Sequence, residues 1–484
     1  MTNAIDIAYL IAGLTFILGL RMLTSPVRAP LGNRVAATGM AIAVIATLLT
    51  PNLSNYWLIA PAMVVGAALG IGSARQVKMT AMPQMVAIFN GMGGGAAASV
   101  STLEFLHQTY YGAALPTGKA LTIALGAAIG AVSFAGSMVA FAKLQELLTG
   151  TVFPIRWSKI ANAVLLCALI ACAVAVTFGS TNRLLMAALV VLALAVGLLL
   201  VLPIGGADMP VVISLMNALT GVAAALTGFV LNNELLIVSG ALVGASGTLL
   251  TQLMARAMNR PLTNVLFGGF GVQVAAGMEL PAGATVREIS AEDAGYLMSY
   301  SRRVVIVPGY GLAVAQGQHQ LREVADLLTE SGVDVKYAIH PVAGRMPGHM
   351  NVLLAEANVS YSQVYDMEAI NGEFPSTDVV LVVGANDITN PGARDDPGSA
   401  IYGMPILNVD YAGHIIVLKR SMRPGFAGID NPLYYNPKTT MLFGDAKDSL
   451  QHLVTALKAA ARPAETRKQH AQPDPEMSGT KSAV

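Results

Sequence analysis

The sequence predicts an α-helical membrane bundle followed by a Rossmann-like α/β domain with a doubly wound parallel sheet. Over the first 257 residues, apolar runs long enough to cross a bilayer follow one another with short polar breaks. From Val304 onward the pattern changes to alternating strands and helices, which is typical of a parallel sheet. The composition agrees, because 54% of the 484 residues are hydrophobic and only 12% are charged, which is more apolar than an average soluble domain.

The apolar runs predict about nine membrane spans, within one either way, because each is close to the roughly 17–25 residues that a spanning helix needs. An odd number places the two ends of this region on opposite sides of the membrane. The runs lie near residues 4–23, 35–50, 55–74, 84–103, 119–142, 159–178, 184–203, 209–231 and 235–255.

Basic residues in the loops indicate the orientation. One side carries only Lys119 and Arg183, whereas the other side collects ten basic residues. By the positive-inside rule, the N-terminus lies outside and the α/β domain lies in the cytoplasm. The ten are Arg21, Arg28, Arg34, Arg75, Lys78, Lys143, Arg156, Lys159, Arg256 and Arg260.

Pairs of glycines four residues apart recur within the apolar runs. Such pairs allow helix backbones to approach closely, so we expect a tightly packed bundle. The pairs are Gly66/Gly70, Gly91/Gly95, Gly126/Gly130 and Gly240/Gly244.

Three hydrogen-bonding side chains, Asn90, Ser137 and Asn217, lie inside the predicted spans. Counted from the cytoplasmic ends, both asparagines lie about 9–12 Å deep and Ser137 lies slightly shallower. This layer could order an internal water chain that carries protons, or it could only join helices at about 0.6 kcal/mol per contact. The residue types favour neither reading. Asp208, at the cytoplasmic mouth of the eighth run, is expected to cap a helix or relay a proton.

Several classes of site are not predicted. The net charge is +1 and the chain has no basic run, so we expect no nucleic-acid partner. The two cysteines, Cys167 and Cys172, lie five apart in one apolar run and face different sides of a helix, which predicts neither a disulfide nor a metal site. Glu104 and His107 are expected to be solvated at the outer surface.

We expect residues 1–257 to form the membrane domain, 258–300 a linker, 301–460 the α/β domain and 461–484 a disordered tail. Within the α/β domain the pattern predicts strands at 304–308, 334–340 and 378–384, and two more near 405–409 and 414–418. It predicts helices at 312–330 and 349–358, and a last helix that Asp445 opens.

The turn after the first of these strands reads Gly309-x-Gly311-x-x-Val314. A strand before this motif and a helix after it are the context that a dinucleotide-binding unit requires. The end of the third strand, Gly384-Ala385-Asn386-Asp387, would then lie at the usual ligand edge of the sheet. Asp387 is either a loop cap or, beside a bound cofactor, a group whose proton responds to the cofactor.

Residues further along the chain indicate whether the cofactor is NAD or NADP. A site that prefers NAD ends its second strand with an acid for the ribose 2′-hydroxyl, but here His340-Pro341 follows the strand and no acid is near. Lys419-Arg420-Ser421 closes a later strand with two cations and a hydroxyl, which suits a 2′-phosphate. One such pair can also be an ordinary surface turn. Together the two observations favour NADP over NAD.

Long segments of the chain match one family. In the α/β domain they begin at Pro308-Gly-Tyr-Gly-Leu-Ala-Val, His340-Pro-Val-Ala-Gly-Arg-Met-Pro-Gly-His, Val383-Gly-Ala-Asn-Asp, Gly403-Met-Pro-Ile-Leu, Val417-Leu-Lys-Arg-Ser-Met and Leu442-Phe-Gly-Asp-Ala-Lys, and in the membrane part at Ala207-Asp-Met-Pro-Val-Val. On these segments, which cover about residues 1–460, the chain resembles the beta subunits of proton-translocating NAD(P) transhydrogenases.

The resemblance implies a reaction in which hydride passes between NAD(H) and NADP(H), coupled to inward proton movement across the cell inner membrane. This chain would bind NADP(H), and the NAD(H) site would lie on a separate alpha subunit. Membrane lipid and a second copy of the membrane domain are the other expected partners.

The resemblance also implies a set of NADP(H) contacts, to which we add Gly309, Gly311 and Val314 from the motif. The family's contacts fall on Tyr310, Val342, Ala343, Gly344, Arg345, Met346, Pro347, Gly384, Ala385, Asn386, Asp387, Ile388, Gly403, Met404, Lys419, Arg420, Ser421, Met422, Arg423, Pro424, Gly425, Phe426, Asp445 and Ala446. For proton passage and its coupling we expect Asn90, Ser137, Asn217, Asp208 and Asp387 to act.

The chain departs from the family pattern at three places. Asn90 stands where well-known members carry histidine, so the predicted proton layer has no ionisable side chain. The segment from Asn408 reads Asn-Val-Asp-Tyr where Glu-Val-Trp-Lys is usual, and Phe426 replaces a common tyrosine. Two other functions remain open: a channel gated by an NADP domain, and a nucleotide-binding anchor for another oxidoreductase.

Overall fold

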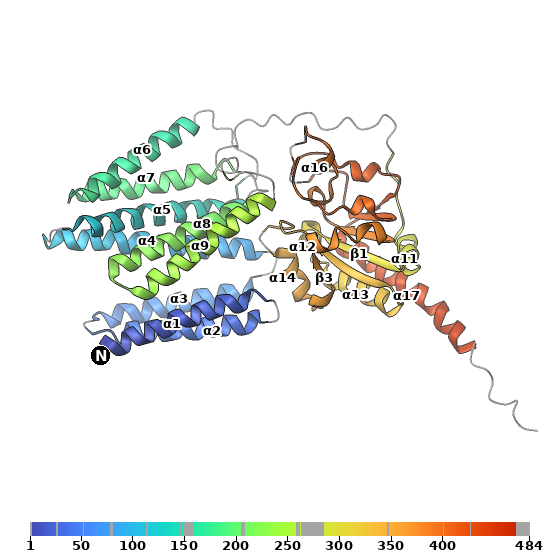
Figure 1. The fold of residues 1–484 in the computed structure, drawn as a ribbon, viewed down its shortest axis with the longest axis horizontal. Coiled ribbons are helices and arrows are strands. Elements are labelled where there is room, and N and C mark those ends of the chain that lie inside the picture. The colour runs from blue at the N-terminus through green and yellow to red at the C-terminus, as the bar shows by residue number, and fades with distance from the viewer. Residues whose placement is uncertain are drawn as a thin grey trace, which may run out of the picture. The chain divides into compact units, whose positions relative to one another are not determined.

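The structure is a computed structural model that describes most of the chain. The described residues are 2–25, 28–51, 53–77, 81–112, 115–145, 147–148, 158–204, 209–257, 262, 285–345, 348–399, 401–425 and 427–470; the side chains of 2–3, 158–161 and 461–470 are not described. The chain divides into two compact units, Met1–Val272 and Gln273–Val484 (Figure 1).

A helix covers each of the nine predicted apolar runs. They are α1 (Thr2–Leu23), α2 (Ala29–Leu48), α3 (Tyr56–Gln76), α4 (Met82–Tyr110), α5 (Thr117–Leu144), α6 (Ser158–Thr177), α7 (Arg183–Val201), α8 (Met209–Leu231) and α9 (Glu234–Ala257). Within the described residues, seven helices are long and apolar enough to cross a membrane; α4 is not among them, and the apolar stretch of α6 is the shorter Asn162–Thr177. The number of spans therefore stays a prediction.

Glycines set the close packing of two helix pairs. A Cβ on Gly94 of α4 would lie 2.9 Å from the carbonyl oxygen of Gly130 in α5, and a Cβ on Gly240 of α9 would lie 2.7 Å from that of Gly221 in α8. The predicted tight packing is confirmed for these pairs. In α3, by contrast, nothing lies within 4 Å of a Cβ on Gly66 or Gly70.

Polar contacts identify the two ends of the helical bundle. At the end where α9 stops and the chain continues to the second unit, the Gln84 amide at the start of α4 donates to the Leu144 carbonyl at the end of α5, at 3.1 Å. We call this the linker end. At the opposite end, Lys119 of α5 pairs with Glu104 of α4 at 2.6 Å.

The second unit contains a six-stranded parallel sheet in the order β3-β2-β1-β4-β5-β6. The predicted fold class is confirmed. The strands are β1 (Arg303–Pro308), β2 (Asp334–Ile339), β3 (Val364–Asp366), β4 (Val379–Val383), β5 (His414–Lys419) and β6 (Thr439–Phe443), and the helices are α11 (Ala291–Ser299), α12 (Tyr310–Ala315), α13 (Gln318–Glu330), α14 (His349–Glu356), α15 (Met367–Ile370), α16 (Gly392–Asp395) and α17 (Ala446–His470).

The central strands are β1 and β4. All five residues of β4 and residues 304–308 of β1 are buried, as expected for parallel strands covered on both faces. The sheet also joins part of the predicted linker, because Glu288 forms a parallel bridge with Met441 of β6.

Two predicted elements differ in the structure. The helix expected at 312–330 is two helices, α12 and α13, because Gln316 is left-handed (φ 54°). Residues 405–409 form no strand: Pro405 has no N–H to donate, its carbonyl bonds His340 Nε2 at 2.8 Å, and the Ile406 carbonyl accepts from the Asn371 amide at 2.9 Å. The short strands β3 and β6 were not predicted.

Candidate functional site

The carboxyl ends of β1 and β4 meet at the point where the strand order reverses. β1 pairs with β2 on one side and with β4 on the other, and in such sheets ligands bind in the crevice outside the strand ends at this switch point. The turns after β1 and β4 are the predicted Gly309–Gly311 and Gly384–Asp387 segments.

These two turns touch through glycines. The N–H of Gly309 donates to the Val383 carbonyl and that of Gly311 to the Gly384 carbonyl, both at 2.8 Å. A Cβ on Gly311 would lie 2.7 Å from the Cα of Gly384, which itself has φ +66°. The glycines are therefore required by the contact between the turns, whereas Val314 is exposed on α12.

The turn after β2 is built around Tyr310 and His349. The guanidinium of Arg345 stacks 4.5 Å from the centre of the Tyr310 ring, and the Arg345 N–H donates to Nδ1 of His349 at 3.0 Å. Gly344 makes the turn possible with φ +104°. Val342 and Ala343 lie in this turn beside the core, while Met346 and Pro347 lie outside the described residues.

The turn after β4 is held by the loop that follows β5. The side-chain oxygen of Asn386 accepts from the Tyr434 hydroxyl at 2.7 Å and from the Asn431 amide at 3.1 Å. One carboxylate oxygen of Asp387 accepts from the Ala427 N–H at 3.0 Å. A Cβ on Gly425 would lie 2.6 Å from Asp387, so the two segments are in close contact.

The three residues predicted to bind a 2′-phosphate, Lys419, Arg420 and Ser421, differ in exposure. Lys419 turns back into its own loop, where its Nζ donates to the Arg423 carbonyl at 2.5 Å and lies 4.8 Å from the Tyr434 ring. Burial lowers the pKa of Lys419, opposed by the charges of Asp387 and Asp430. Arg420 and Ser421 are exposed at the carboxyl end of β5. The remaining residues of the loop are Met422, Arg423, Pro424 and Gly425, and Phe426 lies outside the described residues.

Gly403 and Met404 line a cavity of about 390 Å³ with Arg394, Tyr402 and Asn408. Arg394 was not among the predicted site residues. Its guanidinium bonds Asp410 at 2.8 Å and Asn408 at 3.0 Å, and it lies 4.9 Å from the Tyr411 ring. Hydrogen bonds to Asp395 and Asp410 raise the pKa of Arg394. Asn408, Asp410 and Tyr411, which belong to one of the segments that depart from the family pattern, therefore converge on one arginine, a grouping that no spacing rule reveals.

Asp445 and Ala446 lie where β6 passes into α17. One Asp445 carboxylate oxygen accepts from the Lys447 N–H at 3.0 Å, which caps the helix. Ile388 is buried behind the turn after β4.

His340, directly after β2, is only 1% exposed. Burial lowers its pKa to about 4, against the raising effect of its bond to the Pro405 carbonyl. Burial, and then the charge of Arg345, lower the pKa of His349 to about 4 as well. Both rings are therefore neutral in the folded unit at neutral pH.

The α/β unit is expected to lose stability as the pH falls from about 6.5 to about 4. In that window the unfolded chain binds a proton at His340 that the folded chain, with a pKa of about 4, does not bind. The loss reaches about 3 kcal/mol at the acid end for this histidine. Hydrogen exchange of the β1 and β4 amides in the full chain, corrected for intrinsic rates, measures it. His340→Gln should flatten the pH dependence, and His414→Gln, at an exposed site, should not; equal slopes in all three chains would contradict the assignment.

In the helical unit the structure brings Asn90 and Ser137 together. The Asn90 amide donates to the Ser137 hydroxyl at 2.9 Å. The Ser133 hydroxyl lies 2.6 Å from that of Thr220, which is 3.4 Å from the Asn90 carbonyl. No hydrogen bond joins Asn217 to this group within the described residues, and Asp208 lies outside them.

Two members of this group, Ser133 and Thr220, were therefore not predicted. A usable signal existed, because Ser133 lies four residues before Ser137 and Thr220 three residues after Asn217, on the same helix faces. We define the polar layer as Asn90, Ser133, Ser137 and Thr220, which joins α4, α5 and α8.

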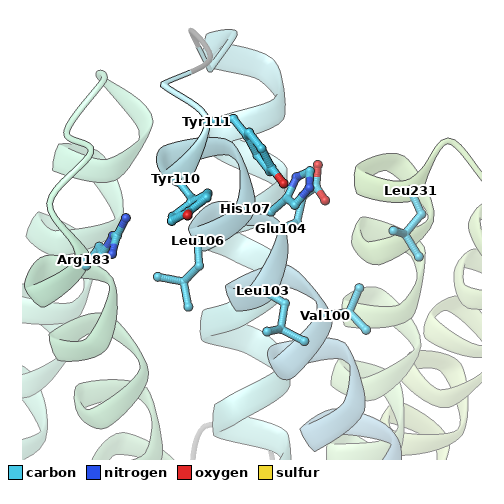
Figure 2. Close-up of a pocket in the computed structure, with 9 residues that line it drawn as sticks. All are labelled: Val100, Leu103, Glu104, Leu106, His107, Tyr110, Tyr111, Arg183 and Leu231. Carbon is cyan, nitrogen blue, oxygen red and sulfur yellow. The ribbon is translucent and has the colours of Figure 1, made fainter. Parts of the chain in front are cut away.

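A second cavity, of about 660 Å³, lies at the end of the bundle opposite the linker. Figure 2 shows Glu104, His107, Tyr110 and Tyr111 on the last turns of α4, with Arg183 on α7 to one side. Glu104 is not simply solvated as expected, because it pairs with Lys119 at 2.6 Å and accepts from the Gln108 amide at 2.9 Å. Among the described residues, no group of three or more metal-ligating side chains gathers.

Comparisons with known proteins identify a family for this chain. Residues 5–456 match the family described as NAD(P) transhydrogenase beta subunit. Two curated relatives, one from Rhodospirillum rubrum and one from a named strain of that species, are each called NAD(P) transhydrogenase subunit beta. Each is 49% identical over 466 residues, which cover 94% of this chain and all of the relative. The resemblance drawn from the sequence is confirmed: the chain belongs to the NAD(P) transhydrogenase beta subunit family.

Proposed function

We propose that this chain binds NADP(H) in its α/β unit and moves protons through its helical unit, coupling the two to hydride exchange with NAD(H) on an alpha subunit. The proposal extends the family membership with one observation that carries it. At the carboxyl edge of the sheet, Arg420 and Ser421 are exposed after β5, and His340 rather than an acid follows β2. A cation and a hydroxyl, with no acid directly after β2, suit the 2′-phosphate of NADP(H).

The residues at this edge fit a dinucleotide. Gly309, Gly311 and Gly384 place backbone rather than side chains where the turns after β1 and β4 meet. The loop after β5 is tied to the turn after β4, because the Ala427 N–H donates to Asp387 and the Asn431 amide donates to Asn386, and this loop would cover a bound cofactor and exclude water. When bound, the cofactor supplies the nicotinamide that accepts or donates hydride. Gly403, Met404 and Asp445, with Ala446, would complete the site as the family resemblance implies.

For the membrane part we propose residues 1–257 as the proton-translocating domain, with 258–300 as the linker and 301–460 as the NADP(H) domain. The polar layer supplies hydroxyl and amide groups from three helices, which can hold a water chain where lipid cannot. Asn217 and Asp208 would extend this path toward the cytoplasm. The N-terminus would lie outside a cell inner membrane, where lipid and a second copy are the further partners.

Coupling requires that the affinity of the chain for NADP(H) change with the protonation state of the chain. Asp387 suits this role, because its carboxylate holds the Ala427 N–H of the covering loop at 3.0 Å and its charge acts on Lys419.

Asp387→Asn is expected to tighten NADP(H) binding about 3- to 10-fold and to slow proton-coupled turnover by a similar factor. The amide can still accept from Ala427, but it removes a negative charge beside an anionic ligand, and slow release then limits turnover. Equilibrium binding and steady-state turnover of the reconstituted complex measure the two effects. Asp366→Asn, at an exposed position where β3 ends, is the matched control. Unchanged affinity and turnover in Asp387→Asn would remove Asp387 from the coupling path.

The whole proposal is tested by mixing the purified chain with an NAD-binding partner subunit. NADPH-dependent reduction of an NAD analogue, with and without a proton gradient across proteoliposomes, should depend on both subunits and respond to the gradient. Proton movement without hydride transfer would instead indicate a gated channel, and binding without either activity would indicate an anchor.

A further inference from the structure

Lys143 is a buried cation near the linker end of the bundle. Its side chain lies in the last turn of α5 and is only 5% exposed. Among the described residues of α1–α9, it is the one charged side chain in the buried class. It follows Ser137 of the polar layer by six residues on the same helix, which is roughly 9 Å of helical rise.

The ammonium group is held by neutral partners. Its Nζ donates to the carbonyl oxygens of Leu202 at 2.5 Å and Ile204 at 2.7 Å. Leu202 is the C-cap of α7, so its carbonyl lies at the negative end of that helix, and Ile204 follows two residues later. No carboxylate of the described residues forms a salt bridge with Lys143; Glu146 and Asp208, the acids nearest in sequence to these groups, lie outside the described part of the chain.

A charge in this position is costly to bury when only neutral groups surround it. A neutral donor can tie helix ends together at the same level, because Gln84 of α4 donates to the Leu144 carbonyl at 3.1 Å and is itself buried. Joining α5 to α7 therefore does not require an ammonium group. The positive charge needs a separate reason.

We propose that Lys143 is a positioning residue for proton transfer. Its charge keeps excess protons out of the polar layer while its hydrogen bonds to the Leu202 and Ile204 carbonyls are formed. This inference rests on the proposed function. A positive charge within about two helical turns of the layer disfavours a second positive charge there, because the effective dielectric constant of a protein interior is about 20 rather than about 80. Protonated water therefore enters the layer only when the 202–204 segment shifts and the ammonium moves with it. The chain thus limits proton leak without an ionisable group in the layer itself.

The test uses the complex of this chain and its partner subunit in proteoliposomes, with proton leak measured in the absence of nucleotides. Lys143→Gln keeps a hydrogen-bond donor but removes the charge, and should raise the leak about tenfold and shift its pH profile toward higher pH. Lys143→Arg should restore the low leak of the unsubstituted complex. Gln84→Met removes a buried polar contact at the same end without changing charge and should leave the leak unchanged.

A leak in Lys143→Gln equal to that of the unsubstituted complex would overturn the proposal, as would an equal rise in Gln84→Met, which would assign the effect to packing. An unshifted pH profile in Lys143→Gln would also overturn it. Because the leak is measured without nucleotides, it does not depend on hydride transfer. A complex that exchanges hydride without pumping protons would refute the proposed function. The proton leak of the variants could still be compared with that of the unsubstituted complex.

Discussion

Arg420→Ala is expected to weaken NADP(H) binding about 10- to 100-fold while NAD(H) binding to the chain remains as weak as before. Arg420 is exposed at the carboxyl end of β5, where a 2′-phosphate would lie against it. A hydrogen bond to a charged group contributes about 1.5–3 kcal/mol, and each 1.4 kcal/mol is about tenfold in affinity. NAD(H) lacks the 2′-phosphate, so its binding does not depend on an interaction with Arg420.

Titration calorimetry with both nucleotides on the purified full chain measures this difference. Ser421→Ala should lower NADP(H) affinity by a smaller factor, because a neutral hydroxyl contributes about 1 kcal/mol. Arg302→Ala is the control, since Arg302 is also exposed but lies before β1, at the opposite edge of the sheet. Equal losses for NADP(H) and NAD(H), or no loss for either, would contradict the assignment of Arg420 to the 2′-phosphate.

Asn90→Leu is expected to lower proton-coupled turnover at least tenfold, while hydride exchange that needs no proton movement stays within about twofold of the unsubstituted rate. The substitution removes the donor that the Ser137 hydroxyl accepts from at 2.9 Å. An unpaired polar group costs about 1–3 kcal/mol, and the apolar side chain would displace water from the layer. Proton uptake and nucleotide reduction in proteoliposomes report the two rates separately.

Ser101→Ala is the matched control for Asn90→Leu. Ser101 is also on α4 and fully buried, but its hydroxyl has no hydrogen-bond partner among the described residues. Its removal should therefore leave coupling unchanged. Asn90→His would restore the side chain that the family resemblance leads one to expect and should make turnover depend on pH near 6.5, the usual histidine pKa. Normal coupling in Asn90→Leu would exclude the polar layer from the proton path.

The α/β fold could be predicted because its central strands are short, continuous apolar runs. Residues 304–308 and 379–383 are buried on both faces of the sheet, so their sequence carries no polar alternation that would suggest an edge. The turns after them could be predicted from Gly309, Gly311 and Gly384, because the requirement for glycine arises from the local backbone conformation. This was enough to place the candidate site at the carboxyl edge.

Predictions failed where side chains replace regular backbone pairing. Residues 405–409 have strand-like apolar character, but His340 and Asn371 bond their carbonyl groups and a 3-10 turn at Val409–Tyr411 follows. The break at Gln316 requires a left-handed residue that is not glycine, a conformation that sequence patterns rarely indicate. The arginine cluster at Arg394 joins residues 14 and 16 positions apart, and no helical or strand period predicts that distance.

The two-part architecture, the nine helical runs and the candidate nucleotide-binding edge of the sheet could be predicted from the residues alone, because each depends on local hydrophobicity and on glycine turns. Which polar groups meet inside the bundle could not be predicted in this way. Depth along a helix follows from residue counting, which placed Asn90, Ser137 and Asn217 at one level, but contact also depends on how each helix is rotated about its axis. Packing through glycines sets that rotation, and it joins Asn90 to Ser137, with Ser133 and Thr220 beside them. The same packing buries Lys143 against the end of α7, a position that its place among the loop cations did not reveal.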